Sequence, residues 1–85
     1  MEHERLQTQI RDLIAHIIEV PPAEVHPDRH LVSDLGADPL NALEIVACLE
    51  RQYGIVIDVA SFQELATLGS ATRLVESLLR YKRDA

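Results

Sequence analysis

Residues 31–50 read LVSDLGADPLNALEIVACLE and contain the clearest helix start in the chain. Aspartate is a good N-cap residue at position 38. Proline is favoured at the first helical position, here position 39, because its missing N–H leaves no hydrogen bond unmade there. These residues predict a helix from Pro39 to about Tyr53, ended by Gly54. The residues predicted to face the core are Leu43, Val46, Ala47 and Leu49, with Leu40 near its mouth.

One further helix is predicted on each side of this one. Apolar residues recur at helical spacing in residues 3–20, and Pro21-Pro22 ends that segment because the residue before a proline avoids the α region. Thr67 is a suitable cap for a last helix that runs to about Lys82. The predicted inward residues of the first helix are Leu6, Ile10, Leu13, Ile14 and Ile17. Those of the last helix are Leu68, Ala71, Val75, Leu78 and Leu79.

The remaining segments predict connections. Residues 21–37 contain three prolines and no sustained period, which indicates a long loop. Ile55–Ile57 is too short and solitary to build a sheet and predicts an extended apolar link. Ser61 and Glu64 stand at capping-box spacing and predict a short helix over about residues 60–66. The residues predicted to pin these connections to the core are Val25, Leu31, Val32, Leu35, Phe62 and Leu65.

These elements predict an all-α protein, a small four-helix bundle with three main helices, a short third helix and a long first loop. The chain has 85 residues, 47% of them hydrophobic, which is typical of a globular protein. At this length we expect a single domain spanning residues 1–85, because a second core would have too few residues to close.

The charge balance and the apolar runs limit which partners and which cellular location we expect. The chain carries 14 acidic and 8 basic residues, a formal net charge of −6 with histidine neutral. A body of that sign repels phosphate backbones, so we expect no nucleic-acid partner and favour basic protein surfaces. No run approaches the ~20 apolar residues of a membrane span, and the acidic start differs from a secretory signal. We therefore expect a cytoplasmic protein without a transmembrane segment. The late basic residues Arg80, Lys82 and Arg83 suit a helix C-terminus.

No residue pattern predicts catalysis or a metal site. His26 and His30 could share a metal only on a helix, which Pro27 disfavours. Cys48, the only cysteine, lies in mid-helix with no cationic neighbour evident from the sequence, and predicts an inert thiol. No Gly-rich phosphate loop, nucleophile elbow or Ser/His/Asp arrangement is present, so we predict that the chain is not an enzyme and has no catalytic residue.

The D-L-G-A-D segment of residues 34–38, followed by Glu44-Ile45-Val46 and Leu49-Glu50, closely resembles the acyl carrier protein family. In that family a D-L-G-A-D-S-L segment precedes the second helix, and E-[LI]-V and L-E follow along it. The resemblance covers almost the whole chain without a required gap. It implies the acyl-carrier-protein type of four-helix bundle.

One position departs from the family pattern. The serine that receives phosphopantetheine in the family corresponds to Pro39 here. The resemblance implies that a serine hydroxyl at this position would form a phosphodiester to the phosphopantetheine arm, whose thiol carries the acyl group. Because proline has no hydroxyl, no phosphopantetheine cofactor is expected at Pro39. Ser33, six positions upstream, lies outside the matched motif and is not expected to replace it.

The resemblance also implies a docking surface. In the family, partner enzymes recognise the acidic second helix through basic patches. The positions that the resemblance assigns to docking here are Asp38, Leu40, Glu44, Ile45 and Glu50. The implied partners are enzymes of acyl-chain synthesis or transfer with basic docking patches, and we expect the chain to be a monomer.

Three functions fit the sequence. The first is a docking module of fatty-acid, polyketide or lipid-type biosynthesis that keeps the carrier's shape without phosphopantetheine. The second is a genuine acyl carrier that shuttles thioester-bound acyl groups, with its attachment residue altered in this particular sequence or located elsewhere. The third is noncovalent binding of an acyl chain in the aliphatic core, which has one Phe, two Tyr and no Trp to fill it.

Overall fold

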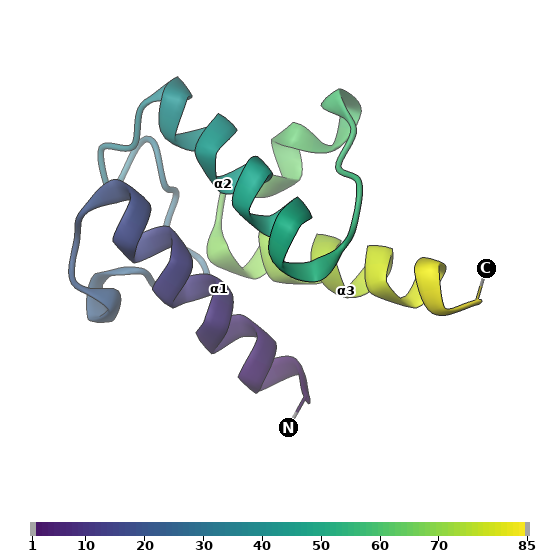
Figure 1. Cartoon of the computed structure of the whole chain (residues 1–85). Coiled ribbons are helices and arrows are strands. Elements are labelled where there is room, and N and C mark those ends of the chain that lie inside the picture. The colour runs from purple at the N-terminus through teal and green to yellow at the C-terminus, as the bar shows by residue number, and fades with distance from the viewer. Residues whose placement is uncertain (1, 85) are drawn as a thin grey trace.

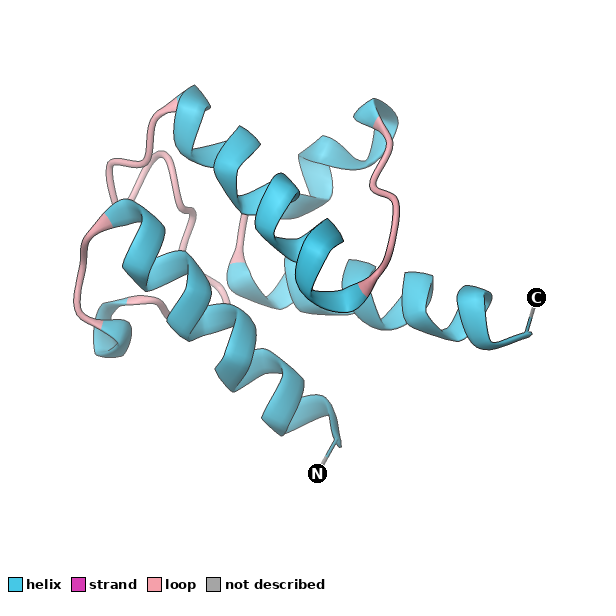
Figure 2. Ribbon diagram, in the orientation of Figure 1, coloured by secondary structure: helices cyan, strands magenta, loops and turns pink. Residues whose placement is uncertain are grey.

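Helices form nearly all the regular structure of residues 2–84, which are the residues that the computed structural model describes (Figure 1). The helices are α1 (Glu2–Ile18), the 3₁₀ helix η1 (Pro22–Glu24), α2 (Pro39–Tyr53), the 3₁₀ helix η2 (Val59–Leu65) and α3 (Leu68–Asp84). Loops join them, and residues 2–84 contain no strand (Figure 2). The predicted all-α bundle is confirmed, and its short third helix is a 3₁₀ helix.

The helices pack around one aliphatic core. α1 and α2 contact each other and both contact α3, while η2 packs on α3 (Figure 1). The buried hydrophobic residues among those described are Ile10, Ile14, Ala15, Val25, Leu31, Ala37, Ile45, Val46, Leu49, Ile55, Ile57, Leu65, Leu68, Ala71, Leu74 and Val75. Within residues 2–84, the helices are too short or too polar for any of them to cross a lipid bilayer.

α1 ends two residues before its predicted limit. Glu19 has a φ of 60°, and the N–H of Val20 donates to the carbonyl oxygen of Ala15 at 3.0 Å. This bond and the left-handed residue before it form a Schellman turn, which satisfies a carbonyl at the helix end. The turn lets Val20 leave the α region, as the proline after it requires.

The long loop is anchored mainly through Leu31. Its N–H donates to the Ala66 carbonyl at 2.8 Å, and its own carbonyl accepts from the Ala37 N–H at 3.0 Å. Val25 and Leu31 are buried and Leu35 is half-buried, as predicted. The prediction for Val32 is wrong, because its side chain is 53% exposed.

The ends of α2 agree with the prediction, but its buried face differs. Gly54 takes φ 64°, and its N–H donates to the Glu50 carbonyl at 2.9 Å, which ends the helix as predicted. Leu43 is 54% exposed and Ala47 is exposed, although both were predicted to face the core. The buried residues of α2 are Ile45, Val46 and Leu49.

The link and η2 follow α2. Ile55 and Ile57 are buried while Val56 is 80% exposed, so the predicted apolar link alternates as an extended segment does. The cap of η2 is Asp58 rather than Ser61, because the Asp58 carboxylate accepts from the Ser61 N–H at 3.0 Å. The short helix therefore begins one residue earlier than predicted.

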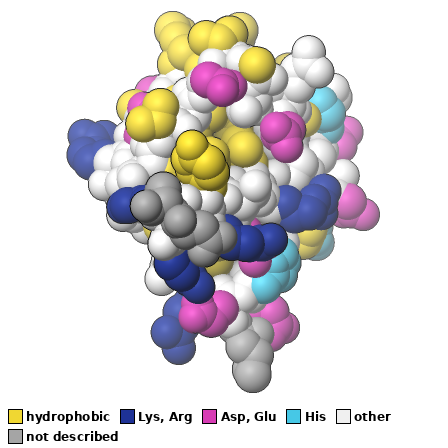
Figure 3. Space-filling model, turned by 90° about the vertical axis from the view of Figure 1, so that its right-hand side faces the viewer, with side chains coloured by type: hydrophobic (Ala, Val, Ile, Leu, Met, Phe, Trp, Pro, Cys, Tyr) yellow, Lys and Arg dark blue, Asp and Glu magenta, His cyan; other side chains and the backbone are white. Residues whose placement is uncertain are grey.

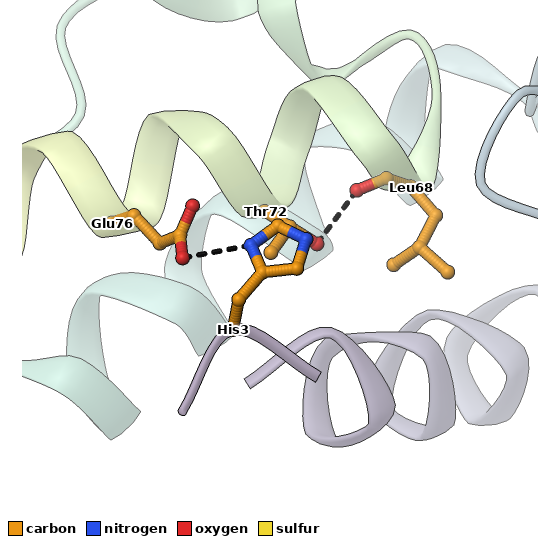
Figure 4. Close-up of polar contacts among 4 residues, drawn as sticks. All are labelled: His3, Leu68, Thr72 and Glu76. Atoms are coloured by element: carbon orange, nitrogen blue, oxygen red, sulfur yellow. Dashed lines mark hydrogen bonds and ion pairs between the residues drawn. The ribbon is translucent and has the colours of Figure 1, made fainter. Parts of the chain in front are cut away.

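α3 begins where Thr67 caps it, as predicted. The Thr67 hydroxyl accepts from the Ser70 N–H at 3.1 Å. Buried Thr72 was not among the predicted inward residues, and its hydroxyl donates to the Leu68 carbonyl at 2.8 Å (Figure 4). That bond satisfies a polar group whose burial without a partner would cost stability.

A hydrogen bond joins the first turn of α1 to the middle of α3. Figure 4 shows the His3 ring beside the Glu76 carboxylate, with 2.8 Å between Nδ1 and Oε2. Both side chains are partly exposed to solvent, so the pair stabilises the fold only slightly.

Candidate attachment and docking site

The start of α2 is held by a reciprocal pair of hydrogen bonds. The Asp38 carboxylate accepts from the Asn41 N–H at 2.9 Å, and the Asn41 side-chain oxygen accepts from the Asp38 N–H at 3.0 Å. This is a capping box with asparagine in place of the usual Glu or Gln. It fixes the backbone on both sides of Pro39, which occupies the first position of the helix.

A glycine brings the loop into this position. Gly36 has a φ of 75°, and its N–H donates to the Val32 carbonyl at 3.1 Å. Residues with a Cβ are strained at such a φ, so glycine is favoured at this turn. Ala37 then enters the core at 8% exposure, and Asp38 emerges again to cap the helix.

Pro39 is exposed at the helix start but offers no group for a prosthetic arm. Its ring nitrogen is part of the peptide bond, and its side chain is hydrocarbon. The residue therefore does not fit covalent attachment of phosphopantetheine.

Ser33 is also exposed, but the loop already uses its polar groups. Its N–H donates to Nδ1 of His30 at 3.3 Å, and its Oγ lies 3.4 Å from the same nitrogen. The His30 N–H donates to Oδ2 of Asp34 at 2.8 Å. These bonds form a local turn, and they position no residue against Pro39.

The exposed face of α2 carries part of the predicted docking surface. Leu40 is 68% exposed, and Glu44 lies four residues further along, on the same side of the helix. Leu43 and Ala47 extend this side. We call Leu40, Leu43, Glu44 and Ala47 the α2 face; the exposed Asp38 lies at its N-terminal end.

Two residues predicted to dock have other places in the fold. Ile45 is 2% exposed and belongs to the core, so its predicted contact with a partner is wrong. Glu50 is half-buried, and its Oε2 accepts from the Ile57 N–H at 2.8 Å. That bond ties the link after α2 back to the helix, which makes Glu50 a structural acceptor.

Sequence reasoning missed Leu43 and Val32 as exposed apolar residues beside this site. A second set of apolar residues at helical spacing lies on the same helix and faces the core. Its members are Ala42, Ile45, Val46 and Leu49. A prediction based on this set would have placed Leu43 on the exposed side of the helix.

The cavity beside the helix start is small. It has a volume of about 30 Å³, far below the roughly 300–1,000 Å³ that is usual for small-molecule sites. The residues lining it are Leu31, Val32, Ala37, Asp38, Ala42, Ile45, Leu65 and Ala66. An acyl chain could enter here only if these side chains moved apart.

Other polar groups of α2 serve the fold. Nη2 of Arg51 lies 3.8 Å from the Cys48 sulfur, so the thiol does have the cationic neighbour that the sequence did not reveal. The Tyr53 hydroxyl donates to Oε1 of Gln9 at 2.9 Å and joins α2 to α1. Burial raises the pKa of Tyr53, and a hydrogen bond from Gln52 opposes that rise. The described residues include no group of three or more His, Cys, Asp or Glu placed to hold a metal.

Comparison with known proteins identifies the family of this chain and its fold. The family described as "phosphopantetheine attachment site" matches residues 8–75, which include the loop, α2, η2, most of α1 and the first half of α3. The fold is similar to that of an acyl carrier protein from Enterococcus faecalis, with a TM-score of 0.76 and 23% identity. The similarity covers 92% of this chain and 99% of that chain. The chain therefore belongs to the phosphopantetheine attachment site family, a family of carrier domains, and has the fold of an acyl carrier protein.

Proposed function

We propose that this chain is an acyl-carrier-like module of fatty-acid, polyketide or lipid biosynthesis that docks on partner enzymes without carrying phosphopantetheine. One observation carries the proposal: an intact carrier scaffold presents Pro39 where the family resemblance expects a serine. Carrier function in the family depends on the arm, so a scaffold without an arm retains only its surface.

The local structure explains how the scaffold tolerates this residue. Proline fixes φ near −65° and lacks a backbone N–H, and both properties suit the first position of a helix. The capping box of Asp38 and Asn41 forms around Pro39 without distortion. Loss of the hydroxyl thus carries no evident folding penalty.

The docking surface that we propose is the α2 face together with Asp38. It combines exposed leucines with the carboxylates of Asp38 and Glu44, and residues 38–53 have three acidic side chains and one basic side chain, a net charge of −2. Such a surface fits a partner with an apolar patch bordered by Lys or Arg. Binding is expected to be weak and sensitive to salt.

A transferase assay tests the proposal. The chain and the Pro39→Ser variant are incubated with a phosphopantetheinyl transferase and coenzyme A, and their intact masses are compared. We expect no mass increase for the parent chain and a phosphopantetheine increment for the variant, because only the serine hydroxyl can form the phosphodiester. An increment on the chain with Pro39 would overturn the proposal.

A genuine carrier is the second candidate, favoured by the family match over residues 8–75. In that case the attachment residue is either altered at position 39 of this sequence or located elsewhere, with Ser33 the hydroxyl in the adjacent loop. A Ser33→Ala variant that loses a mass increment seen in the parent chain would identify that residue. We propose for either function a monomeric, single-domain protein of the cytoplasm that does no catalysis of its own.

A further inference from the structure

An open apolar groove lies between the link after α2 and the last turns of α3. Its volume is about 340 Å³, which is within the range of roughly 300–1,000 Å³ that is usual for small-molecule sites. The residues lining it are Gly54, Ile55, Val56, Leu78, Tyr81 and Lys82. The groove is at the C-terminal end of α2, and Pro39 is at the N-terminal end, about 22 Å away along the helix.

Two of the apolar side chains that line the groove are largely exposed to solvent. Ile55 is buried beneath it, whereas Val56 is 80% exposed and Tyr81 is 75% exposed at its edges. Figure 3 shows the molecule from the side on which the chain ends, with hydrophobic side chains above that end and Lys and Arg side chains around it.

Lys82 is the one charged residue that lines the groove. Its ammonium lies over Gly54, where an added Cβ would be 2.7 Å from Nζ. The ammonium has no ion pair with any other side chain that the structure describes. Arg80 and Arg83 lie in the same end of α3 and add to the local positive potential, although the whole chain carries a net charge of −6.

We propose that this groove binds a free long-chain carboxylate. Its carboxylate would lie beside Lys82, and its alkyl chain would cover Ile55, Val56 and Leu78. The argument is complementarity: apolar walls with a single unpaired cation fit an apolar ligand with a single anionic head. This site is separate from the proposed docking on the α2 face, and it needs no covalent attachment.

A titration followed by ¹⁵N NMR tests the site, with sodium dodecanoate below its micelle concentration as the probe. We expect saturable shifts of the amides lining the groove and unchanged amides at residues 40–44. Dodecyltrimethylammonium, which has the same tail and the opposite charge, should bind about fivefold or more weakly. Absence of saturable shifts, or shifts centred on the small cavity beside Ile45 and Leu65, would refute the proposal.

Charge variants make the test specific. Lys82→Glu should weaken dodecanoate binding about fivefold or more, because it replaces the attracting charge with a repelling one. Arg73→Glu is the matched control, since Arg73 is exposed on the same helix but does not line the groove. The Arg73→Glu variant should bind dodecanoate as the parent chain does.

Val56→Asp places a carboxylate on an exposed wall of the groove and should also weaken dodecanoate binding. Equal losses in the Lys82 and Arg73 variants would show that only net charge matters and would overturn the site.

Discussion

At the scale of single residues, Asp38 and Pro39 have separate tasks. The Asp38 carboxylate accepts from the Asn41 N–H and so caps α2, which is a stabilising role that any carrier fold could use. Pro39 occupies the next position and determines which chemistry is available there. Under the proposed function, stability and loading are therefore controlled by adjacent residues and can be changed one at a time.

Asp38→Ala should lower the free energy of unfolding by about 1 kcal/mol, because the cap of α2 is lost. Asp38→Asn is the control, since its side-chain oxygen can accept the same hydrogen bond. Urea denaturation followed by circular dichroism measures both. A destabilisation of equal size in the two variants would show that the charge, and not the cap, stabilises the helix.

At the scale of elements, the ends of α2 were predictable because Asp38-Pro39 and Gly54 act through local backbone geometry. The buried face of α2 was not predictable, because apolar residues lie on both sides of this helix. Two stripes fitted the spacing, and only packing against α1 and α3 selects the one that contains Ile45. The hydrogen bond from the Ile57 N–H to Glu50 was also not predictable. A glutamate that docks a partner and one that accepts a hydrogen bond from the fold have the same sequence pattern.

The contact between α1 and α2 gives a pH-dependent prediction. Burial raises the pKa of Tyr53 above its ordinary value of 10.0. The folded state therefore holds the phenolic proton longer than the unfolded state does. The stability that this confers is complete below about pH 10 and is lost as pH rises through the folded-state pKa.

Tyr53→Phe should consequently show a shallower loss of stability above pH 10 than the parent chain. Near neutral pH the variant should be less stable by about 0.5–1.5 kcal/mol, because the hydrogen bond to Gln9 is lost. Tyr81→Phe is the control for the loss of a hydroxyl, since Tyr81 is 75% exposed and its removal should leave the stability near neutral pH unchanged. Thermal melts at several pH values measure the slopes. Equal slopes for the Tyr53 variant and the parent would contradict this account.

At the scale of the whole molecule, the proposed surfaces lie at different ends of α2. The α2 face and Asp38 begin at the N-terminal end, beside the loop that Gly36 turns. The apolar groove with Lys82 lies at the C-terminal end. The two proposed sites carry opposite charges and share no residue, so a basic enzyme and an anionic ligand would not compete for one surface.

Docking by the α2 face should depend on both charge and salt. Glu44→Lys should weaken binding to a carrier-dependent enzyme of acyl-chain synthesis by about three- to fivefold at low salt, and the difference should shrink as salt rises. Glu24→Lys makes the same charge change on the exposed η1 and should have little effect. Leu40→Ala should weaken binding at every salt concentration, because its contact is apolar. Surface plasmon resonance measures these affinities, and equal effects of the Glu44 and Glu24 changes would contradict the proposed surface.

The intact mass of the chain purified from its native host tests the central claim most directly. We predict the mass of the unmodified polypeptide, since Pro39 offers no oxygen to esterify. A phosphopantetheine increment on any residue of that protein would contradict the claim and identify the chain as a working acyl carrier.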